Sequence, residues 1–104
     1  MGKQWKHRLD LADVWERTEA NDGDLTVQQT ARIVADRLRA IIPELRIRNT
    51  PLDNLTDIIM AFDGLSEDEG ADGDWDALDY CMDSLYDWAD VNRRMSINTF
   101  SVTE

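Results

Sequence analysis

The most constraining feature of this sequence is a stretch of 42 residues, 51–92, that contains thirteen Asp and Glu residues and no Lys or Arg. Carboxylates without a partner stay in water because burying a charge is costly. Each helix or strand formed in this stretch must therefore keep one face polar and can bury only the other. The rest of the chain nearly balances its charges, so this stretch accounts for the formal net charge of −11.

Apolar residues recur with the period of an α-helix in four segments, and local signals mark some of their ends. Thr26 and Gln29 have the spacing of a capping box at the start of the second segment, which Pro43 is expected to end. Pro51 suits the first turn of a third helix, and Gly64 suits its end. The predicted helices cover residues 11–19, 27–42, 51–64 and 75–90.

Two short segments, one near each end of the chain, have the patterns of strands. Residues 5–9 alternate apolar and polar side chains, and residues 95–102 are rich in Ser, Thr, Ile, Phe and Val. We expect these two segments to pair. The sequence therefore predicts a single domain over residues 1–104, which is mainly α and compact, with about four helices and a short two-stranded pairing of the N- and C-terminal segments.

Five aspartates follow one face of the predicted fourth helix, opposite its apolar side. This acidic face consists of Asp76, Asp79, Asp83, Asp87 and Asp90. Like charges four residues apart on a helix cost about 0.2–0.5 kcal/mol per pair, and Asp favours a helix less than Glu does. Because the acidic face lowers the stability of its own helix, we expect it to bind a partner. The plain alternative is a face that meets only water.

The position of the counter-charges decides between two interpretations of the acidic face. Arginines concentrate between Arg32 and Arg48, and they could pair with the face inside the fold. An open face would instead carry a charge every ~5 Å over roughly 21 Å, against one phosphate per ~3.4 Å along a DNA strand. The open face predicts mimicry of DNA and binding to a basic, nucleic-acid-binding surface, with Tyr80 and Tyr86 as flanking contacts. The net charge argues against direct binding of nucleic acid.

The sequence lacks the motifs of known catalytic and cofactor sites. It has no glycine-rich phosphate loop, no nucleophile elbow and no His/Cys metal set. The single histidine, His7, stands near a terminus that we expect to be exposed, without an evident base or metal partner. Cys81 falls on the apolar side of the fourth helix, where we expect an unreactive thiol. We therefore expect no enzyme activity and no cofactor.

A calcium-dependent module is a further alternative, because Asp72, Asp74 and Asp76 have the 1-3-5 spacing of a calcium loop. Ala77 stands where such a loop has glycine at its sixth position, and Asp83 stands where it has a bidentate Glu at its twelfth. Most of this window also belongs to the predicted fourth helix. We therefore predict no specific metal site.

The segments WKHRLDLADVW, from Trp5 to Trp15, and LYDWAD, from Leu85 to Asp90, are followed at the C-terminus by a short tail with the aromatic residue Phe100. These features resemble the two ends of small acidic proteins encoded by tailed phages of actinobacteria. The tail departs from that group at residues 93–97, where its members have a Val-Trp-Ile type of sequence. The group has no assigned activity, so the resemblance implies a phage origin and action in the host cytoplasm.

Together these features predict a non-enzymatic, phage-type interaction protein. It would bind a host or phage protein through the acidic face, as a DNA-mimicking inhibitor. The alternative is a structural or accessory phage protein that self-associates through an apolar face, for example as a homodimer. No apolar run approaches the roughly 18 residues that a membrane span requires, so we expect no membrane partner.

Overall fold

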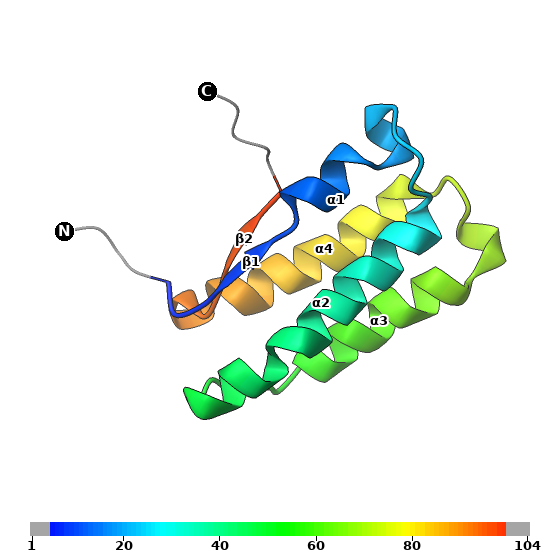
Figure 1. The fold of residues 1–104 in the computed structure, drawn as a ribbon. Coiled ribbons are helices and arrows are strands. Elements are labelled where there is room, and N and C mark those ends of the chain that lie inside the picture. Colours follow the sequence, from blue (N-terminus) through cyan, green and yellow to red (C-terminus); the bar gives the residue numbers. More distant parts are fainter. Residues whose placement is uncertain (1–4, 100–104) are drawn as a thin grey trace, which may run out of the picture.

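Three long helices form the body of the computed structural model, which describes residues 5–99 (Figure 1). Short 3₁₀ turns lie at residues 19–21, 69–71 and 91–93. The helices and strands, in chain order, are β1 (Arg8–Asp10), α1 (Ala12–Glu16), α2 (Val27–Ile47), α3 (Leu55–Glu67), α4 (Trp75–Asp90) and β2 (Ser96–Asn98). The predicted fold, mainly α with four helices, is confirmed.

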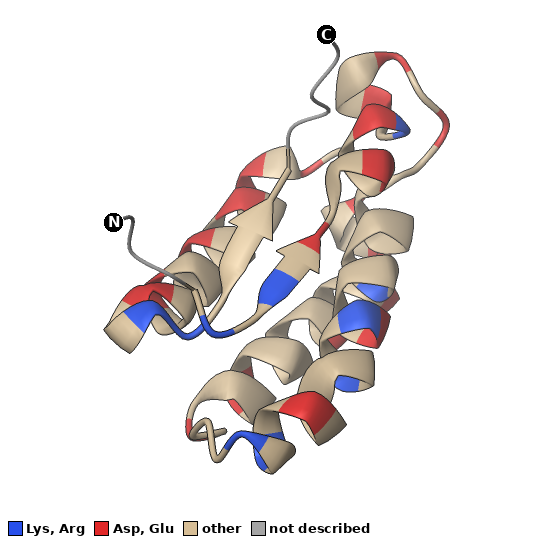
Figure 2. Cartoon of the chain, turned by 60° about the vertical axis from the view of Figure 1, so that its left-hand side comes forward, with Lys and Arg blue, Asp and Glu red and all other residues tan. Residues whose placement is uncertain are grey.

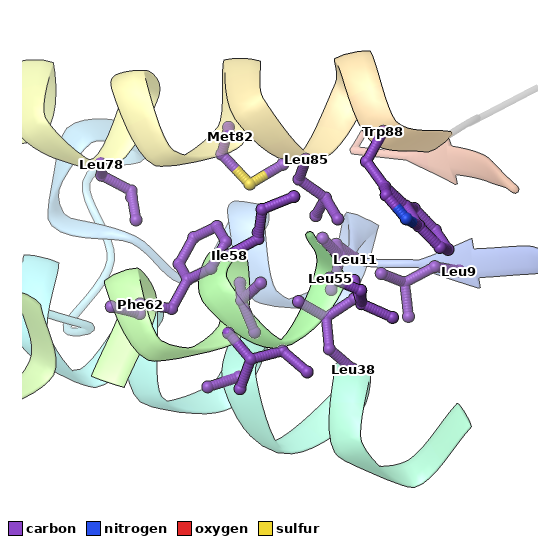
Figure 3. Packing of buried hydrophobic residues seen from close by; sticks show 14 of the residues in the cluster. Leu9, Leu11, Leu38, Leu55, Ile58, Phe62, Leu78, Met82, Leu85 and Trp88 are labelled. Atoms are coloured by element: carbon purple, nitrogen blue, oxygen red, sulfur yellow. The ribbon is translucent and has the colours of Figure 1, made fainter. Parts of the chain in front are cut away.

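The three long helices lie side by side, and each runs antiparallel to the one before it (Figure 1). The connections of residues 48–54 and 68–74 are short, which favours antiparallel packing of consecutive helices. Leu9 and Leu11, from β1 and the residue before α1, are buried between α4 and α2 (Figure 3). The strands and α1 therefore close the core on the side that the helix layer leaves open.

Two segments near the ends of the chain form a parallel pair of strands. Arg8 lies opposite Ser96, and Asp10 lies opposite Asn98. The pairing confirms the prediction, although each strand has only three residues and the residues from 100 onward lie outside the described part of the chain. Parallel strands require a long crossover connection, and here the whole helical body provides it.

The core is built around one apolar stripe of α4. Phe62 of α3, which is fully buried, lies across from this stripe (Figure 3). The buried residues of the stripe are Leu78, Met82, Leu85 and Trp88, each at most 5 % exposed. Their spacing of four, three and three residues keeps them on one side of a helix, so their burial fixes the rotation of α4 about its axis.

α2 continues through Pro43, where the sequence predicted its end, and reaches Ile47. Within a helix, proline loses the hydrogen bond to the carbonyl four residues earlier and costs about 3 kcal/mol. Leu45, two residues beyond it, is fully buried. Burial of a leucine side chain contributes about 1.5–3 kcal/mol, so this packing offsets most of the cost of the proline.

The predicted limits of α3 are also wrong at both ends. The helix begins at Leu55 rather than near Pro51, because Thr50 is buried and held by other contacts instead of capping a helix. It continues past Gly64 to Glu67, because Leu65 must remain helical to reach the core, where it is buried.

α1 is shorter than predicted and ends at Glu16. The hydroxyl of Thr18 donates to the carbonyl of Trp15, and Thr18 forms an isolated parallel bridge with Leu25. This pairing draws residues 17–18 out of the helix.

His7 is buried, contrary to the prediction of an exposed residue without partners. Its side chain lies between the end of α2 and the connection to α3: Nδ1 is 2.6 Å from Oε2 of Glu44, and Nε2 is 2.9 Å from Oγ1 of Thr50. Because a carboxylate only accepts, Nδ1 donates to Glu44, and Nε2 of a neutral ring accepts from the Thr50 hydroxyl. The contact ties the segment before β1 to the helical layer.

Removal of the Thr50 hydroxyl tests this contact. Thr50→Val keeps the shape of the side chain but leaves Nε2 of the buried His7 without a partner, so we expect the free energy of unfolding to fall by about 1–3 kcal/mol. Urea denaturation measures this change. Thr56→Val, on the exposed side of α3, is the matched control and should change the free energy of unfolding by less than about 0.5 kcal/mol. Equal losses in the two variants would contradict the role of the hydroxyl.

Candidate interaction surface

The acidic face lies on α4, the one helix whose predicted limits match the structure at both ends. Asp74 caps its start, since its carboxylate accepts a hydrogen bond from the backbone N–H of Ala77 at 3.1 Å. From there the helix runs over Trp75–Asp90, as predicted. Because the apolar stripe of α4 turns inward, the aspartates on the opposite side face outward.

All five aspartates of the acidic face are exposed, and none of them forms an ion pair or a side-chain hydrogen bond within residues 5–99. Figure 2 shows acidic positions repeating along α4, whereas basic positions lie mainly on α2 and near the strands. Tyr80 is 78 % exposed and Tyr86 is 38 % exposed. The structure therefore presents the predicted partner-binding residues together on one open surface.

Two arginines of α2, Arg37 and Arg39, pair with acids outside the acidic face. Both terminal nitrogens of Arg37 donate to the carboxylate of Asp13, each at 2.7 Å. Arg39 forms ion pairs with Asp36 and Asp63. The predicted alternative, in which the arginines between residues 32 and 48 neutralise the acidic face, is therefore not found in the described part of the chain.

The bidentate contact of Arg37 has a clear electrostatic consequence. Its hydrogen bonds to Asp13 lower the pKa of that carboxyl below the ordinary 3.8, and the positive charge of Arg37 acts in the same direction, while slight burial opposes both. This pair joins α2 to α1 and leaves neither group available to α4.

The two arginines that follow α4 lie over aromatic rings. The guanidinium of Arg93 is 5.4 Å from the centre of the Trp5 ring, and that of Arg94 is 5.2 Å from the centre of the Trp88 ring. Both are cation–π contacts. Neither arginine forms an ion pair with an acid within residues 5–99.

The structure also adds acids that the sequence analysis did not single out. Asp53, in the turn before α3, and Asp57, in its first turn, line a groove together with Asp87 of the acidic face. Only the packing of α3 and the turn before it against α4 shows that these two acids adjoin the acidic face. The acidic surface thus extends over two helices.

Two of the aspartates with the spacing of a calcium loop, Asp74 and Asp76, lie at the start of α4. Asp74 caps α4 and Asp76 occupies its first turn, where the helix dipole favours an acid. No group of three His, Cys, Asp or Glu residues within residues 5–99 is placed to hold a metal ion.

Cys81 is half-buried on α4, and burial raises the pKa of its thiol. The fraction of reactive thiolate is correspondingly reduced.

Among the described helices, none combines the length and apolar character needed to cross a membrane.

The repulsion within the acidic face can be measured as stability. Asp83 has a like charge four residues away on each side, at Asp79 and Asp87. Asp83→Asn removes both repulsions, so we expect the free energy of unfolding to rise by about 0.4–1 kcal/mol in low salt. Urea denaturation measures this change, with Asp24→Asn in the exposed turn after α1 as the control. A loss of stability in Asp83→Asn would instead reveal an internal partner for that carboxylate.

The pair of Asp13 and Arg37 predicts a pH dependence. Because the pKa of Asp13 is lowered in the folded chain, the pair stabilises the fold above pH 3.8, and this contribution disappears as the pH falls through the lowered value. We expect Asp13→Asn to lower the free energy of unfolding near neutral pH by up to about 1 kcal/mol, since both groups are partly exposed. Urea denaturation as a function of pH should show the two proteins converging in acid. A difference that grows on acidification would contradict the pairing.

Comparison with family models, curated proteins and solved structures finds no match to this chain.

Proposed function

We propose that this chain is a non-enzymatic interaction protein that binds the basic surface of a nucleic-acid-binding protein through the acidic face of α4. The observation that carries the proposal is the exposure of all five aspartates without a counter-charge within residues 5–99. A surface of this kind attracts cationic partners and raises their rate of association.

The dimensions of the acidic face favour mimicry of a DNA strand. From Asp76 to Asp90 the helix rises roughly 21 Å, so its five charges stand ~5 Å apart on average. Phosphates along one DNA strand stand ~3.4 Å apart along the helix axis. The basic groove of a DNA-binding protein can thus contact several of these carboxylates at once, and the partner loses DNA when the acidic face occupies that groove.

Aromatic side chains on this surface supply contacts beyond charge. Tyr80 and Tyr86 are exposed on α4, next to the aspartates. Exposed tyrosines often act as anchors of protein interfaces, because they add a large contact area and one hydrogen-bonding group. The proposal therefore combines electrostatic attraction along α4 with a local aromatic contact.

Self-association through an apolar face receives less support. The exposed large aliphatic side chains within residues 5–99 come from separate elements: Ile47 from the end of α2, Met60 from α3 and Val91 from the turn after α4. Single exposed apolar residues are normal on a protein surface.

Because the two ends of the sequence resemble small acidic proteins of actinobacterial phages, we propose that the interaction takes place in the cytoplasm of a phage-infected host.

Charge neutralisation on α4 tests the proposal. The acidic-face variant is Asp79→Asn/Asp83→Asn/Asp90→Asn, and its matched control is Glu16→Gln/Glu19→Gln/Asp24→Asn, which removes the same charge from exposed positions on and after α1. Each protein is immobilised and exposed to an actinobacterial lysate in low salt. We expect the wild type and the control to retain a basic protein that added duplex DNA releases, and the acidic-face variant to lose it.

The dependence on salt supplies a second readout. Retention through exposed carboxylates should fall steeply between about 0.05 and 0.5 M salt, because screening shortens the reach of the charges. The proposal is wrong if the acidic-face variant retains the same protein as the wild type, or if neither DNA nor salt releases that protein.

A further inference from the structure

A groove of about 640 Å³ lies between α3 and α4, beside the acidic face. Asp53 and Asp57 line it from the α3 side, and Asp87 lines it from α4. Apolar surface comes from Ile58 and Trp88, which are 9 % and 5 % exposed. The groove therefore combines an apolar wall with carboxylates.

The charges in this groove are unbalanced. Asp53, Asp57 and Asp87 form no ion pair or side-chain hydrogen bond within residues 5–99, and among the described residues that line the groove Arg94 is the only cation. Two negative charges thus remain without a counter-charge. A second cation can enter without being repelled overall.

The groove already holds one guanidinium against its aromatic wall. Arg94 lies over the Trp88 ring at 5.2 Å from its centre. Trp88 is also the residue whose buried indole N–H has no hydrogen-bond partner within residues 5–99. The ring face of this wall thus suits a planar cation, whereas the indole N–H is a donor that only an acceptor, and not a guanidinium, can satisfy.

We propose that this groove receives an arginine side chain of the basic partner. The methylene stem of an arginine packs on apolar surface such as that of Ile58 and Trp88, while its guanidinium reaches the carboxylates at the rim. Arginine suits the site better than lysine, because its planar group stacks on aromatic rings and donates in pairs to carboxylates. The inference rests on the proposed function: the acidic face attracts the partner, and the groove selects the side chain that anchors it.

A peptide pair separates charge from shape. The probe is a helical peptide with arginines along one side, and its control has citrulline, which is isosteric and neutral, at the same positions. Binding is followed by NMR at three reporters: the indole N–H of Trp88 and the backbone amide of Asp57 for the groove, and the backbone amide of Asp79 for the acidic face outside it. We expect the arginine peptide to shift all three signals and the citrulline peptide to shift none of them.

Charge changes inside and outside the groove then locate the binding. Asp53→Asn/Asp57→Asn should weaken binding of the arginine peptide by about fivefold, which corresponds to about 1 kcal/mol for the two exposed charges together. The control Glu16→Gln/Asp24→Asn removes the same charge away from the groove and should leave the affinity within about twofold. Circular dichroism confirms that each variant is folded.

Replacement of Arg94 should change the affinity for the arginine peptide in the opposite direction. Arg94→Gln removes the resident cation and should tighten binding of the arginine peptide by about threefold or more. Arg93→Gln changes the net charge equally, but Arg93 lies over Trp5 rather than in the groove, so its effect should be smaller. Equal effects of the two variants would show that only overall charge matters and would overturn the inference.

The remaining outcomes distinguish the inference from the proposed function. Loss of affinity in Asp79→Asn/Asp83→Asn/Asp90→Asn, with full affinity in Asp53→Asn/Asp57→Asn and an unshifted Trp88 signal, overturns the groove and leaves the acidic face as the binding surface. Loss only in Asp53→Asn/Asp57→Asn supports the groove and contradicts the proposed role of the wider face. No shift with the arginine peptide overturns both.

Discussion

The burial of one apolar stripe of α4 is the interaction on which the rest of this structure depends. Leu85 and Trp88 pack into the core with the side chains of α3 and with Leu9, and this packing fixes the rotation of α4. At about 100° per residue, Asp83 and Asp87 then lie about 160° from Leu85 in opposite senses, on the far side of the helix. The direction in which the acidic face points is therefore decided by the apolar residues between the aspartates. Ion pairs do not contribute to this orientation, because the five aspartates form none within residues 5–99.

The features that could be predicted are those specified by local pattern. α4 has a clear apolar stripe, a capping Asp74 and a polar face, and its limits follow from these residues alone. The end of α2 could not be predicted, because the burial of Leu45 by other elements outweighs the local signal of Pro43. The environment of His7 is hidden for the same reason: its two partners lie 37 and 43 residues away in the sequence.

The candidate site divides in a similar way. The exposed row on α4 follows from helical spacing, whereas the groove depends on which side of α3 faces α4. Asp53 and Asp57 look like ordinary solvated acids until the packing of the two helices brings them near Asp87. The partners of the arginines could not be predicted either, since the sequence alone left open whether those of α2 would neutralise the acidic face. The pairing of Arg37 with Asp13 and of Arg39 with Asp63 is a property of the packed helices.

Two locally unfavourable features lie on α4. Like charges repel along the helix, and the indole N–H of Trp88 has no partner in the described residues. Like charges cost a few tenths of a kcal/mol per pair, and an unsatisfied buried donor costs about 1–3 kcal/mol. A small domain has only about 5–15 kcal/mol of stability in total, so such costs are a substantial part of it. Like-charge repulsion of this kind is typical of functional sites, where a partner supplies the missing counter-charge. A basic partner would relieve the repulsion along α4, so its binding should stabilise this helix, whereas removal of the carboxylates stabilises the free helix and weakens binding.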